Sequence, residues 1–163
     1  MTKKNNMQNI IYKKANKEDS KQIAVLVGEL LNEIMTKIDI KAFNFDLEET
    51  YTRLEDFIEK EKNFIFVAKD KDEIMGFITS YEGFALYTEG AFGTIAELYV
   101  RPQYRSSGIG KELINQLRNF ANEKRWLRLE VTTPPLPQFD ETLAFYEREG
   151  FEISGGRKLK KLI

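Results

Sequence analysis

The stretch VRPQYRSSGIGKELI, residues 100–114, carries the most specific pattern in this chain. It passes from an apolar residue through a proline and a basic segment to Gly108 and Gly110, and then into helical spacing. A strand that ends in a glycine-rich loop and opens a helix is a recurring anion site, because the first N–H groups of a helix lack internal partners. Glycine leaves room for a phosphate at those groups. Arg105 and Lys111 add positive charge to the same segment.

Three phosphate-binding patterns can be compared with this segment. The P-loop pattern G-x-x-x-x-G-K-S/T fails, because Arg105 and Glu112 stand where it requires glycine and Ser or Thr. The dinucleotide pattern G-x-G-x-x-G fails at Leu113. The pattern R/Q-x-x-G-x-G/A is matched at every fixed place, from Arg105 to Gly108 and Gly110. The alternative is that the two glycines only permit a tight turn and close helix packing.

Composition limits the chemistry that this chain can perform. Its 163 residues, 42% hydrophobic and 31% charged, are typical of one folded domain with a core of its own. The absence of cysteine excludes disulfides and thiolate nucleophiles, and the absence of histidine excludes imidazole bases and almost every ordinary zinc site. In an enzyme of this composition, proton transfer falls to Asp, Glu, Lys, Tyr or water.

Charge and hydropathy restrict the expected partners and location. A net charge of −1 gives no support for nucleic-acid binding, and no apolar run approaches the length of a membrane span. Residues 1–9 lack the apolar centre of a secretory signal and are expected to form a flexible tail. We therefore expect a cytoplasmic protein, with no membrane partner and no metal site.

Hydrophobic periodicity predicts the element order β-α-α-β-β-β-α-β-α-β-β within a single domain, 1–163. The sheet is expected to be mixed and covered by helices, which makes this an α/β (α+β) chain. Asp19 or Ser20 is expected to cap the first helix, and Asp46 the second. Pro102 is expected to stop the strand that precedes it, and a helix over 140–149 is expected to end at Gly150. The glycine-rich segment 83–93 is expected to form a loop between strands. Predicted strands are 10–15, 63–70, 73–82, 94–100 and 126–133, followed by a closing hairpin over 151–163.

Two motifs make the chain resemble a known family. The stretch AELYVRPQYRSSGIGKELINQL, 96–117, resembles the coenzyme A loop of the GNAT N-acetyltransferases, and LAFYEREGF, 143–151, is similar to that family's second motif. The predicted element order is similar to the GNAT fold over nearly the whole chain. The resemblance implies a mostly antiparallel central sheet flanked by about four helices. It also implies acetyl transfer from acetyl-CoA to a primary amine, without a metal.

The resemblance assigns most contacts with acetyl-CoA to backbone groups. N–H groups of 106–111 would hold the diphosphate, with Arg105 beside it, and the backbone of 98–100 would pair with the pantetheine arm. The strand 126–133 would diverge from its neighbour and leave a gap for the thioester. The expected acetyl-CoA-binding residues are Leu98, Tyr99, Val100, Arg105, Ser106, Ser107, Gly108, Ile109, Gly110, Lys111 and Thr142.

The reaction requires a base for the amine and an acid for the departing thiolate. Glu97, in mid-strand, is the first candidate base, acting through a water; a cross-strand ion pair is its alternative role. Glu130 is the reserve candidate. Tyr146 matches the family's tyrosine, which protonates or hydrogen-bonds the thiolate; a core tyrosine is the alternative. Where many members carry an asparagine that touches the coenzyme A arm, this chain has Phe139, and the role could pass to Asp140 or Thr142.

The acceptor side is expected to include aromatic residues of the predicted connections. Ordinary core or lid packing is the alternative for these rings. The expected acceptor is a small-molecule amine, with a peptide or protein amine as the nearest variant. A non-catalytic acyl-CoA-binding module and a structural α/β protein are the competing hypotheses, and a homodimer formed through the final strands is compatible with the fold. The candidate acceptor residues are Phe43, Phe45, Phe84 and Tyr87.

Overall fold

The computed structural model describes residues 9–163, so the predicted tail over 1–9 lies outside the described residues except for its last position. Contacts divide the chain after Val131 into two compact units, which are described separately below. The first contains the sheet and three α-helices, and the second contains one α-helix and the C-terminal segment. The single domain expected over 1–163 stays a prediction.

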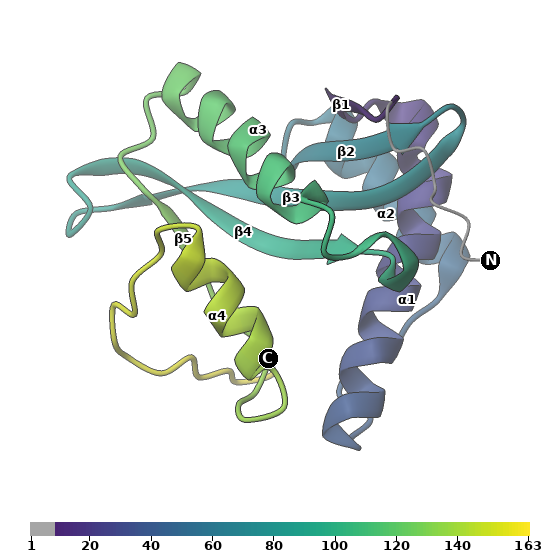
Figure 1. Ribbon diagram of the computed structural model, residues 1–163. Helices are drawn as coiled ribbons and strands as arrows, with labels where there is room; N and C mark the ends of the chain where they lie inside the picture. Colours follow the sequence, from purple (N-terminus) through teal and green to yellow (C-terminus); the bar gives the residue numbers. More distant parts are fainter. Residues whose placement is uncertain (1–8) are drawn as a thin grey trace. The chain divides into compact units, whose positions relative to one another are not determined.

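A five-stranded sheet organises the first unit, with spatial order β1-β2-β3-β4-β5 (Figure 1). Its first four strands pair antiparallel, whereas β4 and β5 pair parallel. This confirms the predicted α/β class with a mixed, mostly antiparallel sheet. The strands are β1 Ile11–Lys14, β2 Phe64–Asp70, β3 Glu73–Ala85, β4 Gly90–Val100 and β5 Leu129–Val131.

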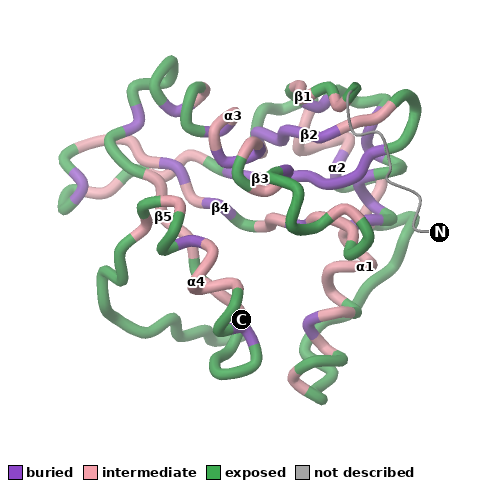
Figure 2. Tube along the Cα trace, viewed as in Figure 1, coloured by how far each residue is buried: buried purple, intermediate pink, exposed green. Residues whose placement is uncertain are grey.

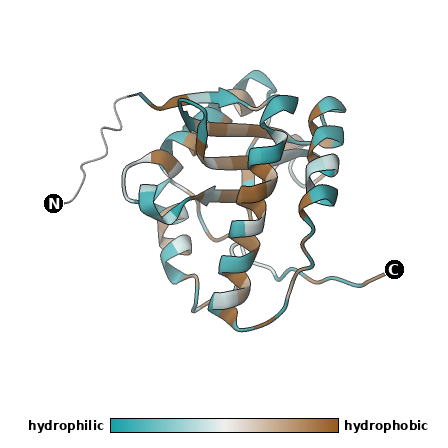
Figure 3. Ribbon diagram, turned by 90° about the vertical axis from the view of Figure 1, so that its right-hand side faces the viewer, coloured by the Kyte–Doolittle hydropathy of each residue, from teal (hydrophilic) through white to brown (hydrophobic). Residues whose placement is uncertain are grey.

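Helices cover both faces of this sheet (Figure 1). On one face, Ile65 and Val67 of β2 belong to the core that α1 (Ser20–Ile38) and α2 (Leu47–Glu59) close. On the other, Phe64 and Phe66 pack on Phe120 of α3 (Ile109–Glu123), with ring centroids 4.8 and 5.7 Å apart. Successive side chains of β2 therefore point to opposite faces of the sheet and contribute to two apolar layers. Figures 2 and 3 show the result: the central strands are both the most buried and the most hydrophobic.

The helix starts agree with the sequence in one case and differ in the other. Asp46 caps α2 as predicted, since its side chain accepts a hydrogen bond of 2.8 Å from the N–H of Glu49. Asp19 makes no side-chain cap to α1. Its buried carboxylate instead accepts from the N–H of Asn16 and from the ammonium groups of Lys13 and Lys69, at 3.0, 2.9 and 3.4 Å. The predicted cap is absent because the Asp19 carboxylate is used in ion pairs with Lys13 of β1 and Lys69 of β2.

The loop predicted over 83–93 is wrong, because most of this segment continues the β3–β4 hairpin. Only 86–89 form the turn, where the hydroxyl of Thr88 donates to the carbonyls of Ala85 and Gly90 at 2.9 and 2.8 Å. Glycine indicates a loop by its conformational freedom, but here it serves close packing. A Cβ at Gly83 would lie only 2.7 Å from the ring of Phe92.

The second unit contains α4 (Asp140–Arg148), which ends as predicted at Gly150 with φ 90°. The closing hairpin expected over 151–163 is wrong, because this segment forms no strand. Apart from half-buried Phe151, its apolar residues, including Leu159 and Leu162, are exposed. Two short strands are marginally stable without a sheet to pack on, which explains why alternation alone did not suffice here. The strand predicted over 126–133 is also shorter than expected, since only Leu129–Val131 pair with β4.

No helix within residues 9–163 combines the length and apolar content that crossing a bilayer requires. Over the same residues, no three or more acidic side chains are grouped so that they could hold a metal ion.

Candidate active site

The glycine segment forms an open loop at the head of α3. Strand β4 ends at Val100, the turn Pro102–Tyr104 follows, and Gly108 with φ 89° is the N-cap of α3. Among the described residues, no side chain caps this helix start. A Cβ placed on Gly108 would meet no atom within 4 Å, so the space beside Gly108 is open. The first N–H groups of α3 are thus available to an external acceptor, which fits a diphosphate.

Strand β4 has one free edge directly before this loop. On its β3 side, Leu98, Tyr99 and Val100 pair with Ile78, Phe77 and Gly76. On its other side, β5 pairs only with Gly93–Ile95. Among the described residues, the backbone of 96–100 therefore has no strand on its second edge. An edge of this kind can accept an extended ligand as though it were a further strand.

Glu97 lies on this stretch of β4, next to a β-bulge. Glu97 pairs with Thr79, whereas Ile95 pairs with Ser80, which leaves Ala96 as the additional residue in β4. The carboxylate of half-buried Glu97 accepts a short hydrogen bond from the Thr79 hydroxyl, and the N–H of Glu97 donates to that hydroxyl at 3.0 Å. Burial raises the pKa of the Glu97 carboxyl above its ordinary value, and the Thr79 hydrogen bond opposes part of that rise.

Glu130 on β5 has a different environment. Its carboxylate accepts from the guanidinium of Arg128 at 2.9 Å and from the hydroxyl of Tyr87 at 3.2 Å. The Arg128 guanidinium also lies 4.9 Å from the centre of the Tyr87 ring. None of the ion pairs formed by residues 9–163 includes Glu97, so the alternative of a cross-strand ion pair receives no support.

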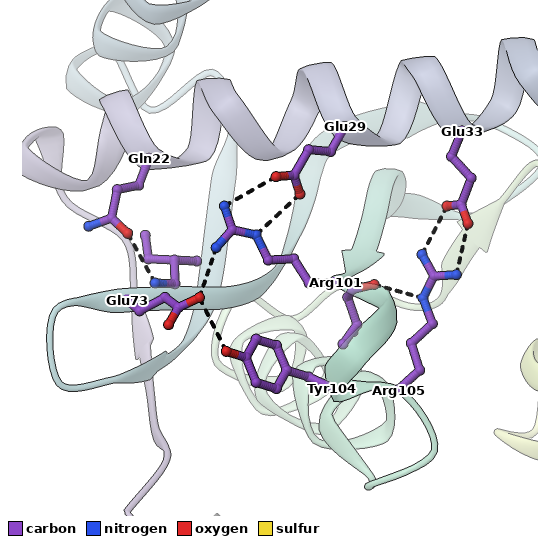
Figure 4. Close-up of polar contacts among 9 residues, drawn as sticks. Gln22, Glu29, Glu33, Glu73, Arg101, Tyr104 and Arg105 are labelled. Atoms are coloured by element: carbon purple, nitrogen blue, oxygen red, sulfur yellow. Dashed lines mark hydrogen bonds and ion pairs between the residues drawn. The ribbon is translucent and has the colours of Figure 1, made fainter. Parts of the chain in front are cut away.

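Two arginines fasten the loop to α1 (Figure 4). The guanidinium of Arg105 donates to both carboxylate oxygens of Glu33, at 2.8 and 2.9 Å, and its Nε donates to the carbonyl of Val100 at 2.7 Å. One turn earlier on α1, Glu29 accepts twice from Arg101, at 3.2 Å each. The Arg105 side chain is therefore directed at α1 rather than left free in the loop.

In the second unit, Tyr146 is buried on α4 between aromatic rings. Its ring lies 5.4 and 5.3 Å from those of Phe145 and Phe151. Burial raises the pKa of the Tyr146 phenol, so the phenol stays protonated at working pH. Thr142 is half-buried on the same helix, and the side chain of Phe139, buried at the N-cap, makes no cap.

The four predicted acceptor aromatics lie in two different parts of the first unit. Phe45 packs on α1, where a Cβ on Gly28 would lie 2.6 Å from its ring. Tyr87 stands at the hairpin turn beside Arg128. Phe43 and Phe84 are exposed. Their role in acceptor binding stays a prediction.

The sequence model described as the acetyltransferase (GNAT) domain matches residues 61–153, which include the glycine loop, Glu97 and Tyr146. The chain belongs to the GNAT acetyltransferase family. A comparison with curated proteins found no match.

Solved structures share this GNAT fold at low sequence identity. A ribosomal-protein-alanine N-acetyltransferase from Brucella melitensis biovar Abortus has 18% identity and a TM-score of 0.72, covering 94% of this chain and 99% of that one. An aminoglycoside acetyltransferase from an uncultured soil metagenomic sample has 23% identity and a TM-score of 0.73, covering 94% and 97%. A transcriptional regulator from Bacillus halodurans has 24% identity and a TM-score of 0.77, covering 95% and 100%. At these identities the likeness shows the fold alone.

Sequence reasoning about this GNAT chain missed two residues of the site region. Thr79 gave no signal, because its pairing with Glu97 depends on the bulge at Ala96, which shifts the strand register. Glu33 did give a signal in the sequence, because with Gln22 and Glu29 it forms a polar stripe at helical spacing on α1. All three make contacts with β3 or with the segment that follows β4 (Figure 4).

Proposed function

We propose that this chain is an acetyl-CoA-dependent N-acetyltransferase that acts on a primary amine of a small molecule. Membership of the GNAT family supports the reaction class, since its members use acetyl-CoA as co-substrate. The observation that carries the proposal is the environment of Glu97. It is a half-buried carboxylate with a raised pKa and no cationic partner among residues 9–163, and it lies on the free edge of β4 that leads into the glycine loop.

Each part of the chain has a proposed task. N–H groups from Ser106 to Lys111 hold the diphosphate, and the free edge of β4 at 98–100 binds the pantetheine arm. Thr142 is proposed to contact the same arm from α4. Acetyl-CoA supplies the acetyl thioester. The chain must then position the thioester and remove a proton from the acceptor, because an ammonium with a pKa near ~10 is not a nucleophile at neutral pH.

Glu97 is the proposed base, and it takes this proton through a water. A raised pKa suits that task, since a base works best when its pKa approaches the operating pH. Tyr146 is proposed to donate a hydrogen bond to the departing thiolate. Its own raised pKa makes complete proton transfer costly but keeps the hydrogen available for donation.

The fold neighbours bear on the class of the acceptor. The fold neighbours include an acetyltransferase named for aminoglycosides and one named for a ribosomal protein, so the fold admits both kinds of amine. We propose the small-molecule class, with Phe43, Phe45, Phe84 and Tyr87 as candidate contacts. The peptide or protein amine is the alternative.

Two measurements on the full chain test the proposed function. Thermal shift with coenzyme A and acetyl-CoA should show stabilisation, since a ligand that binds only the folded state raises Tm. Release of free thiol from acetyl-CoA is then measured against a panel of aminoglycosides, polyamines, amino acids and short peptides. Thiol release that depends on one amine class supports the proposal. Binding without thiol release with any amine would instead indicate a non-catalytic acyl-CoA-binding module, and no shift with either ligand would exclude both functions.

A further inference from the structure

The ion pair between Glu33 and Arg105 is well formed for a pair near the surface. Both guanidinium nitrogens Nη1 and Nη2 bind separate carboxylate oxygens, at 2.8 and 2.9 Å. The side chains retain 23% and 38% of their exposure, so the pair is partly shielded from solvent. Hydrogen bonding from Arg105 holds the pKa of Glu33 below its ordinary value. Geometry of this fork type gives orientation as well as energy.

The same guanidinium joins three parts of the molecule. Its Nε binds the carbonyl of Val100, the last residue of β4, at 2.7 Å. Its Cζ lies 5.4 Å from the centre of the buried Tyr99 ring, and Glu33 attaches it to α1. Arg105 therefore closes the segment 100–105 on itself and fixes it to a packed helix. Three residues further on, Gly108 begins α3 and its free amides.

We propose that Glu33 is a positioning residue for diphosphate binding: through Arg105 it holds the glycine loop so that the first amides of α3 converge on one acceptor. This inference rests on the proposed use of that loop for acetyl-CoA. Glu33 itself touches neither substrate. Its effect is on the geometry of the loop, and hence on affinity for coenzyme A, rather than on the chemical step.

A competing role for Arg105 makes opposite predictions. If Arg105 binds the diphosphate directly, Glu33 competes for it, and removing the carboxylate should leave affinity unchanged or improve it. In that role lysine is an acceptable substitute, because an ammonium binds phosphate as a point charge. In the positioning role lysine fails, because it cannot bind Glu33 bidentately and Val100 at the same time.

The experiment is isothermal titration of the full-length protein and its variants with coenzyme A. For Glu33→Gln and for Arg105→Lys we expect Kd to rise about threefold to tenfold, as for loss of one good ion pair. The conservative variant Glu33→Asp keeps a carboxylate for Arg105 and should lose less affinity than Glu33→Gln. Direct diphosphate binding instead predicts unchanged or tighter binding by both Glu33 variants.

Controls separate positioning from general destabilisation. Asp56→Asn removes a paired helix carboxylate on α2, which contacts Lys60 at 2.5 Å and Lys62 at 3.2 Å, and should leave Kd unchanged. At saturating acetyl-CoA, kcat of Glu33→Gln should stay within about twofold of the wild type, so that only KM for acetyl-CoA changes. If Glu33→Gln does not fold, Arg105→Lys provides the test, because it leaves Glu33 in place.

The outcomes distinguish this inference from the proposed function. Wild-type protein that does not bind coenzyme A contradicts both. Wild-type binding with equal or tighter binding by Glu33→Gln overturns the positioning role and leaves the proposed function standing. Unchanged affinity of Arg105→Lys for coenzyme A would likewise overturn the positioning role and leave the proposed function standing.

Discussion

Glu97 and Glu130 lie on adjacent strands of one sheet, yet their surroundings are opposite. Glu97 is half-buried, its hydrogen-bond partner is the Thr79 hydroxyl, and burial raises the pKa of its carboxyl. Glu130 is held by Arg128 and Tyr87. The difference arises where β5 stops pairing with β4: Glu130 lies within the paired part of β5, whereas Glu97 lies beyond Ile95, the last residue of β4 that pairs with β5. The role of a glutamate on a strand therefore cannot be inferred from its residue type and position until the partners of its carboxylate are known.

The largest effect is expected when each carboxylate is neutralised in turn. Glu97→Gln should lower kcat/KM for acetyl transfer by about 10²–10⁴-fold, the range for loss of a general base. Glu130→Gln should change it by less than about threefold, the scale of a surface ion pair. Steady-state thiol release with the best amine of the panel measures both. Equal losses in the two variants would remove the functional distinction between the strands.

Tyr146 extends the comparison to a second group whose pKa burial raises. Tyr146→Phe keeps the ring packing with Phe145 and Phe151 and removes only the hydroxyl. We expect kcat to fall about tenfold to hundredfold, equivalent to one hydrogen bond to a charged group, with Kd for coenzyme A unchanged. Titration calorimetry beside the kinetics checks this. Turnover equal to the wild type would leave Tyr146 as a core residue only.

Thermal stability should also distinguish Glu97 from Glu130. The substitution of Glu97 that lowers activity is expected to raise Tm. Because burial raises the folded-state pKa of Glu97, the stability associated with its neutral form is present below the unfolded pKa and is lost as pH rises through the folded pKa. Burial thus makes ionisation of this carboxylate destabilising, so Glu97→Gln should raise Tm at neutral pH, on the scale of roughly 2–4 °C.

Glu130→Gln is the matched control for that measurement. It removes an ion pair with Arg128 and should leave Tm unchanged or slightly lower. A lower Tm for Glu97→Gln at neutral pH would mean that the carboxylate stabilises the fold. That result would indicate a structural role for Glu97.

The sequence predicted the parts of this molecule whose structure is local. The turn at Pro102, the glycine at the head of α3 and the end of α4 at Gly150 each follow from the backbone preferences of one or two residues. The second motif likewise predicted α4. These are also the segments in which the family patterns lie, which is why the family could be predicted before the fold.

Features that depend on distant partners could not be predicted. The bulge at Ala96, which sets Glu97 opposite Thr79, is a property of two strands in register. The glycines of 83–93 indicated a loop, because nothing local shows that Phe92 packs on Gly83. The alternation over 151–163 indicated strands, but a strand requires a neighbour to pair with. The partner of Arg105 lies on α1, 72 positions earlier in the chain.

The pH dependence of kcat/KM in the wild type and in Thr79→Val tests the role of Glu97. The activity should fall as pH decreases through the pKa of Glu97, with the midpoint of this acid limb above the ordinary glutamate value of ~4.3. Since the Thr79 hydroxyl lowers that pKa, Thr79→Val should move the limb to higher pH while keeping its shape. An acid limb at the same pH in both proteins, or one that persists in Glu97→Gln, would show that another group removes the proton from the amine.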